Sequence, residues 1–241
     1  MSIGPSSTDR TEPVINIASP YLLEECCKRV LRNRVDEIKE LFDMLKKEPT
    51  RSAAAGVVFA YRAHQFLQEG RVIDLFPILG RITTWGRNVI YDGYAAASEA
   101  DRKRVALPKS KGLVCTDDIG GALEVNTYYR PRDTDLFSID SWFLLQPTPE
   151  KSPILLTFQI ALDVERYDAK RSGLDEVGEL RVPEGILKCL VVFTPTGVEP
   201  EIAVTRDYLT DEFLDGRHPN VAFPVFHCQI SYDVLFQPPS S

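Results

Sequence analysis

The chain has 241 residues, of which 44% are hydrophobic and 26% are charged. These fractions are close to globular averages and exclude a disordered or fibrous protein. The net charge of -7 excludes a uniformly basic nucleic-acid coat but leaves room for a local basic patch. The polar N-terminus lacks the apolar segment of a secretory signal, and the apolar runs are too short to cross a membrane. We therefore expect an intracellular protein, cytoplasmic or nuclear, with no membrane partner.

The cysteines do not form a recognisable framework. There are five of them, an odd number, and none belongs to a CxxC pair: Cys26, Cys27, Cys115, Cys189 and Cys228. We interpret them as reduced thiols rather than as disulfides or zinc ligands.

Helical periodicity dominates the first third of the chain. Residues 1–17 are expected to be a flexible tail, and a single domain follows over residues 18–236, with a second tail at 237–241. Ser19-Pro20 is a typical helix start and opens a helical lead-in over residues 19–50. Another helix is predicted from about Ser52 to Gly70, because apolar residues recur there every three or four positions.

The remaining chain changes to the alternation typical of strands. Five segments are rich in β-branched and aromatic residues: 123–129, 136–145, 154–162, 187–193 and 225–236. A short amphipathic helix carrying Leu174, Val177 and Leu180 lies between the third and the fourth. This order predicts an α/β fold with a mixed central sheet flanked by helices, in which residues 187–193 form a central strand covered on both faces.

Asp140 is the first candidate functional residue, because it interrupts an apolar, strand-like stretch. A buried carboxylate is costly unless it is hydrogen-bonded, paired or bound to a metal. Two interpretations stay open: a metal ligand at the end of a strand, or the commoner turn residue that accepts bonds from local backbone N–H groups.

Gln159 is the second candidate. Period-two geometry places Thr157, Gln159 and Ala161 on one face of the strand. If this strand pairs with the preceding one in a hairpin around residues 147–149, Asp140 and Gln159 lie side by side. A Gln carbonyl oxygen can coordinate Mg²⁺, although an amide that simply bridges two strands is more common.

Two further groups carry positive charge. Arg62 and His64 lie on the helix predicted to begin at Ser52. They either reach a functional site or belong to the solvent-exposed face of a core helix. Five cations fall within ten residues: Arg102, Lys103, Arg104, Lys109 and Lys111. They form either a loop that contacts a phosphate backbone or a solvated, mobile loop.

Taken in order, these segments resemble a family of fungal proteins related to Crinkler effectors and retrotransposon hot-spot proteins. The matching motifs are Ala55–Leu67, Asp140-Ser141, Phe158–Ala161, Lys170–Leu174 and Val191–Pro195. The resemblance implies a restriction-endonuclease-like domain of the PD-(D/E)XK type. Active members hold a divalent metal with a helix Glu, a strand Asp, and a Glu or Gln two residues before a Lys.

This sequence departs from that pattern at two positions, because Ala60 replaces the helix Glu and Ala161 replaces the Lys. The resemblance therefore implies a catalytically impaired, nuclease-like module that binds nucleic acid or protein. The alternative is a Mg²⁺-dependent nuclease of DNA or RNA. In that case Asp140 is the main metal ligand, Gln159 a carbonyl ligand, and Lys170 a substitute for the missing Lys. Whether the protein is an enzyme stays open.

Overall fold

The computed structural model divides the chain into two compact units. One consists of Met1–Gln65 with Tyr232–Ser241, and the other of Phe66–Ser231. The structure describes residues 2–5, 13–16, 20–29, 34–47, 52–77, 79–85, 88–95, 102–119, 121–132, 139–162, 176–177, 180–198, 202–205 and 225–238.

The first unit is mainly helical. Its helices are α1 (Pro20–Arg29), α2 (Val35–Lys46), the larger part of α3 (Ser52–Gln68), and the short α6 (Tyr232–Leu235). The predicted helix start at Pro20 is confirmed, and Gly70, two residues past α3, has a φ of 80°, which glycine adopts readily. Within the N-terminal segment predicted to be a flexible tail, β1 (Ser2–Pro5) and β2 (Pro13–Asn16) pair antiparallel. Among the described residues, no helix is both long enough and apolar enough for a bilayer crossing.

Phe42 is at the centre of the aromatic core of this unit. Its ring centroid lies 6.4 Å from that of Phe59, 5.1 Å from that of Tyr232 and 5.2 Å from that of Phe236. These contacts join α2, α3 and the C-terminal segment. The prediction of a strand through residue 236 is therefore wrong for its second half: the strand ends at Ile230, and α6 presents Leu235 to the core.

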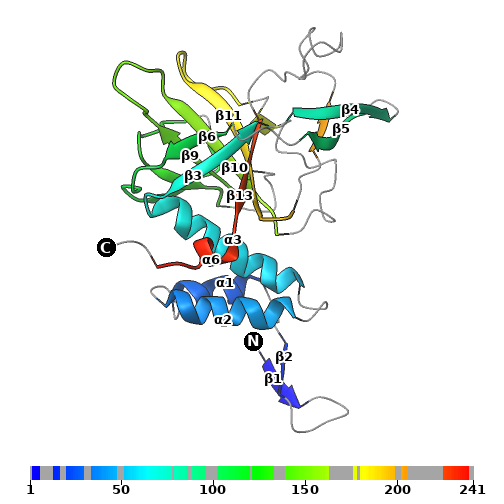
Figure 1. The fold of residues 1–241 in the computed structure, drawn as a ribbon. Coiled ribbons are helices and arrows are strands. Elements are labelled where there is room, and N and C mark those ends of the chain that lie inside the picture. The colour runs from blue at the N-terminus through cyan, green and yellow to red at the C-terminus, as the bar shows by residue number, and fades with distance from the viewer. Residues whose placement is uncertain are drawn as a thin grey trace. The chain divides into compact units, whose positions relative to one another are not determined.

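The second unit is built on an eight-stranded sheet with the order β6-β3-β13-β11-β10-β9-β8-β7. The strands are β3 (Val72–Pro77), β6 (Lys103–Ala106), β7 (Leu113–Cys115), β8 (Tyr128–Arg130), β9 (Ser141–Leu145), β10 (Ile154–Ile160), β11 (Leu187–Pro195) and β13 (Val225–Ile230). The sheet is mixed: β10, β11 and β13 are parallel, whereas β8, β9 and β10 are antiparallel neighbours. Figure 1 shows it as a strongly curled sheet, which confirms the predicted α/β class and mixed sheet.

A second, three-stranded sheet has the order β12-β5-β4. Its strands are β4 (Leu79–Trp85), β5 (Asn88–Ala95) and β12 (Ile202–Thr205).

The main core lies on one face of the eight-stranded sheet. The central strand β11 is buried from Cys189 to Pro195, which confirms the prediction for residues 189–193, whereas Leu187 is exposed and Lys188 is half-buried. The buried residues of this core are Ile119, Tyr129, Ile139, Trp142, Leu144, Leu155, Val177, Leu190, Val192 and Val225. Val177 belongs to the predicted amphipathic helix, of which residues 176–177 are described as helical.

Two predictions about local structure are corrected. Of the predicted strand 123–129, only Tyr128 and Tyr129 belong to an observed strand, β8, because the chain turns at Asn126, whose φ is 63°. The basic run predicted to lie in a loop is partly a strand, since Lys103 and Arg104 belong to β6 and pair with β3.

Candidate functional site

Asp140 lies directly before β9, and Gln159 lies near the end of β10, the neighbouring strand. The two strands pair antiparallel, with Ser141 opposite Phe158, and the backbone N of Asp140 donates to the carbonyl O of Phe158 at 2.9 Å. The regular register ends at this pair, and Asp140 and Gln159 are the next residues on the two chains. The hairpin around residues 147–149 that this pairing requires is therefore confirmed.

The carboxylate of Asp140 is partly buried and hydrogen-bonded to the neighbouring strand. Its Oδ2 accepts a bond from the backbone N of Ile160 at 2.6 Å. The pKa of Asp140 is raised to about 6, mainly by burial and to a smaller extent by the nearby Glu176, although the bond from Ile160 and the charge of Arg130 act to lower it. Ionising Asp140 therefore costs free energy in this fold, and a nearby cation favours the ionised form.

Glu176 supplies a second carboxylate at this place. Its Oε2 accepts a bond from the backbone N of Ile139, the residue before Asp140, at 3.1 Å. The crossover between β10 and β11 carries Glu176, and Val177 next to it is fully buried in the same core as Trp142. Sequence reasoning missed Glu176 because it treated the polar side of the amphipathic helix as solvated.

The donor set of this site suits a hard divalent cation. Two carboxylates, from Asp140 and Glu176, and the amide carbonyl of Gln159 are oxygen donors of the kind that Mg²⁺ prefers, with water completing its coordination. No group of three or more His, Cys, Asp or Glu residues that could hold a metal occurs in the described part of the chain. We name Asp140, Gln159 and Glu176 the carboxylate–amide site.

The remaining residues of the implied catalytic set are Ala161, Ala60 and Lys170. Ala161 follows β10, and its backbone N donates to the carbonyl O of Phe193 at 3.0 Å. Ala60 lies on α3, in the helical unit. Lys170 lies outside the described residues.

The interpretation that Arg62 and His64 lie on a solvated helix face is wrong. Both side chains are buried, Arg62 completely. Nη2 of Arg62 donates to the carbonyl O of Gln237 at 2.9 Å, so this guanidinium fastens the C-terminal segment within the helical unit. This buried, hydrogen-bonded guanidinium therefore has a structural role in the helical unit.

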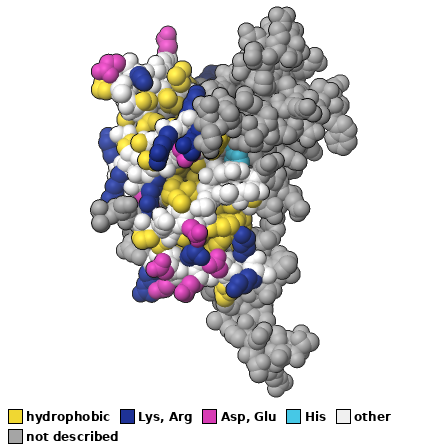
Figure 2. Space-filling model, viewed as in Figure 1, with side chains coloured by type: hydrophobic (Ala, Val, Ile, Leu, Met, Phe, Trp, Pro, Cys, Tyr) yellow, Lys and Arg dark blue, Asp and Glu magenta, His cyan; other side chains and the backbone are white. Residues whose placement is uncertain are grey.

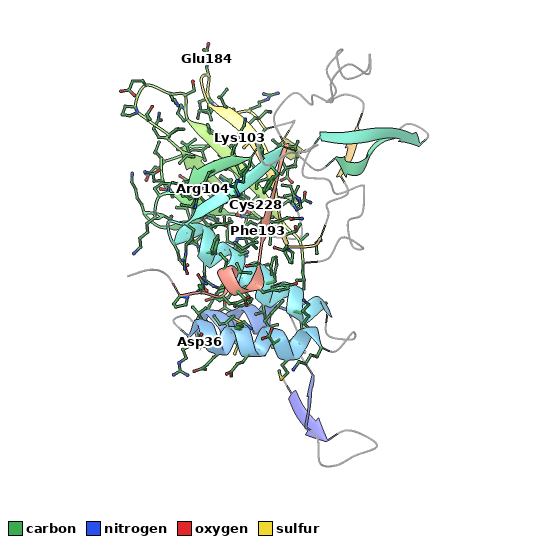
Figure 3. The ribbon with its side chains drawn as sticks, in the orientation of Figure 1. Asp36, Lys103, Arg104, Glu184, Phe193 and Cys228 are labelled. Atoms are coloured by element: carbon green, nitrogen blue, oxygen red, sulfur yellow. The ribbon has the colours of Figure 1, made fainter. Side chains whose placement is uncertain are left out.

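The five cations predicted to bind nucleic acid are all exposed in the structure. They are Arg102, Lys103, Arg104, Lys109 and Lys111, which we name the basic strip. Nε of Arg102 lies 3.9 Å from Oδ1 of Asp74, and Nζ of Lys103 lies 5.2 Å above the ring of Phe226. Figure 3 labels Lys103 and Arg104, and Figure 2 shows Lys and Arg side chains on the surface at this place.

The basic strip and the carboxylate–amide site occupy different parts of the sheet. In the strand order, β6 is separated from β9 by five strand-to-strand steps. At about 4.8 Å a step, this is about 24 Å along the sheet. This separation holds for Arg102, Lys103 and Arg104, whereas Lys109 and Lys111 precede β7, which is two steps from β9.

Comparisons with known proteins give no match. No family model matches the chain, and no curated protein or solved structure is significantly similar to it. The functional proposals therefore depend on the residues just described.

Proposed function

We propose that this protein is a catalytically impaired, nuclease-like module that binds nucleic acid through the basic strip. The observation that carries the proposal is the exposure of five cations within ten residues of a chain whose net charge is -7. Clustered, exposed Lys and Arg side chains are the usual contacts to a phosphate backbone, and they act whatever the base sequence. Ala60 and Ala161, at positions where active relatives of the resembling family carry Glu and Lys, support the loss of catalysis.

Edge protection is a competing explanation for part of the strip. The outer strand of a sheet often carries Lys or Arg so that it does not pair with another chain, and β6 is such an edge strand. This explains Lys103 and Arg104. Edge protection of β6 does not explain Lys109 and Lys111, which follow β6 and are equally exposed. A nucleic-acid role therefore depends most on these two lysines.

Binding to labelled duplex DNA and single-stranded RNA, followed by fluorescence anisotropy, tests the proposal. The strip variant replaces Arg104, Lys109 and Lys111 by Gln. A matched control replaces three exposed cations of the helical unit, Arg29, Arg34 and Lys47, which lie in or beside α1 and α2. We expect the strip variant to bind at least roughly tenfold more weakly and the control to bind almost normally. Equal affinities of the two variants would exclude the strip as the binding surface.

The carboxylate–amide site favours a second function, a divalent-metal-dependent nuclease. With Glu176 beside Asp140, the site has two negative charges, whereas Asp140 and Gln159 alone have one. When bound, a divalent metal would activate water and neutralise charge on a phosphodiester. The protein's own contribution is to position Asp140 through the bond from Ile160, which together with the charge of Arg130 offsets part of the effect of burial on its pKa.

Cleavage assays on plasmid DNA and RNA with Mg²⁺ or Mn²⁺ separate the two functions. For a nuclease, Asp140→Ala abolishes cleavage and Glu176→Gln lowers it by roughly a hundredfold, whereas the exposed Glu184→Gln has no effect. Cleavage that survives Asp140→Ala would come from another site or a contaminant. Wild-type protein that neither cleaves nor gains thermal stability from the metal would leave only the binding function.

A further inference from the structure

Strand β7 forms an unusual edge of the eight-stranded sheet. It is the last strand in the order, and all three of its residues are exposed, with Leu113 at 46% and Val114 at 41%. The opposite edge, β6, exposes Lys103 and Arg104 instead. Charge is one of the devices that keep an edge strand from pairing with another chain, and the three residues of β7 carry none, so this edge can accept a strand.

The hydrogen bonds of β7 show which backbone groups point outward. Toward β8, the carbonyl O of Gly112 accepts from the N of Tyr128 at 3.1 Å, and the N of Thr116 donates to the carbonyl O of Arg130 at 3.0 Å. Because these groups alternate along a strand, the N–H and C=O of Leu113 and Cys115 are directed away from the sheet. Nε of Arg132 donates to the carbonyl O of Cys115 at 3.1 Å, so a strand that pairs here displaces this side chain or shares the oxygen with it.

The two ends of β7 carry opposite charges. Lys109 and Lys111 precede the strand, and Asp117 and Asp118 follow it, all four exposed. Such an edge complements itself when a second copy runs antiparallel to it, since the basic end of each copy then meets the acidic end of the other. Parallel pairing would bring like charges together.

We propose that β7 is a self-association edge, on which a second copy of this chain pairs antiparallel about a two-fold axis at Val114. Pairing at Val114 brings that residue opposite its own copy and Leu113 opposite Cys115 of the partner copy. Both apolar side chains then lose their exposed surface. With three residues on each side, the interface is small and the dimer depends on protein concentration. The inference does not rest on nucleic-acid binding or on the carboxylate–amide site, although Lys109 and Lys111 also belong to the basic strip.

Cysteine cross-linking of the full chain tests the register. In the proposed dimer, the two Val114 Cα atoms form a non-hydrogen-bonded pair about 4.5 Å apart, within disulfide range. A Val114→Cys, Cys115→Ser variant should therefore form a disulfide-linked dimer under mild oxidation. Wild-type Cys115 and a Leu113→Cys, Cys115→Ser variant should not, because their like residues lie diagonally, about 8 Å apart. Equal cross-linking of all three, or of none, would overturn the proposal.

A charge exchange tests the complementarity without an added thiol. By analytical ultracentrifugation in the absence of nucleic acid, Lys111→Glu or Asp117→Lys alone should weaken the dimer roughly tenfold, because these two positions face each other across the axis and symmetry changes two contacts at once. The two substitutions combined should restore it. A protein that stays monomeric at all concentrations, or a double variant no better than the single ones, would contradict the proposal. Lys111 also belongs to the basic strip, and the absence of nucleic acid keeps this measurement of the dimer separate from the binding proposal.

Discussion

The position of Asp140 has both a structural and a functional explanation. The bond that it accepts from Ile160 ties the ends of β9 and β10 together, as a turn residue would. Its pKa of about 6 also shows that the fold does not fully compensate its negative charge. A carboxylate kept in such a place is a natural partner for a cation, and Glu176 adds to the same local negative charge.

The raised pKa predicts a specific dependence of stability on pH. Between the ordinary pKa of 3.8 and about 6, the native state holds a proton at Asp140 that the unfolded chain has lost. Stability from this residue is therefore present at low pH and is lost as the pH rises through this window. We expect Asp140→Asn to match the wild type near pH 4 and to melt at least about 2 °C higher at pH 7.5. Thermal unfolding at both pH values checks this.

The exposed Asp118→Asn serves as the control for that experiment, since it should leave the pH dependence unchanged. Adding Mn²⁺ at pH 7.5 should stabilise the wild type if the carboxylate–amide site binds a metal, and should not stabilise Asp140→Asn. An Asp140→Asn variant that loses stability with pH as the wild type does would refute the assigned pKa.

At the same scale, the sequence predicted only half of the site. The proximity of Asp140 and Gln159 followed from period-two geometry and one hairpin. Glu176 lies on a different element, and nothing local to its sequence indicates that it folds back on Ile139. Arg62 was misjudged because a fully buried arginine is rare and depends on a distant acceptor, the carbonyl of Gln237.

Among the elements, β11 has the largest part in the stability of the sheet unit. Parallel neighbours flank it on both sides, and Leu190, Val191 and Val192 are fully buried. Long, strongly patterned elements such as this strand and α3 were predictable from sequence. The short strands β6 and β7 were not, because four and three residues carry too little periodicity, and pairing with neighbours makes them strands.

One strand provides a matched pair of substitutions. Leu190→Ala should lower the free energy of unfolding by about 2–5 kcal/mol, because it opens a cavity in the core. Leu187→Ala, on the same strand but 58% exposed, should change it by less than about 0.5 kcal/mol. Urea unfolding measures both. Similar effects at the two positions would contradict the central place of β11.

For the whole molecule, a curled sheet presents three features at separate places: the carboxylate–amide site, the basic strip and the edge of β7. The excess of negative charge means that a nucleic acid is repelled by most of the surface and attracted at the strip. Salt screens both the repulsion and the attraction. The salt dependence of the affinity therefore reports the strength of nucleic-acid binding and, when variants are compared, its position on the surface.

The salt dependence of nucleic-acid binding tests the central claim most directly. For duplex DNA, the logarithm of the affinity falls against the logarithm of salt concentration by about 0.9 for each phosphate contact. Replacing Arg104, Lys109 and Lys111 by Gln should therefore reduce that slope by up to about 2.7, whereas the Arg29, Arg34 and Lys47 control should keep it. A wild-type slope near zero, or a slope that the strip variant leaves unchanged, would contradict the proposal that this protein binds nucleic acid through the basic strip.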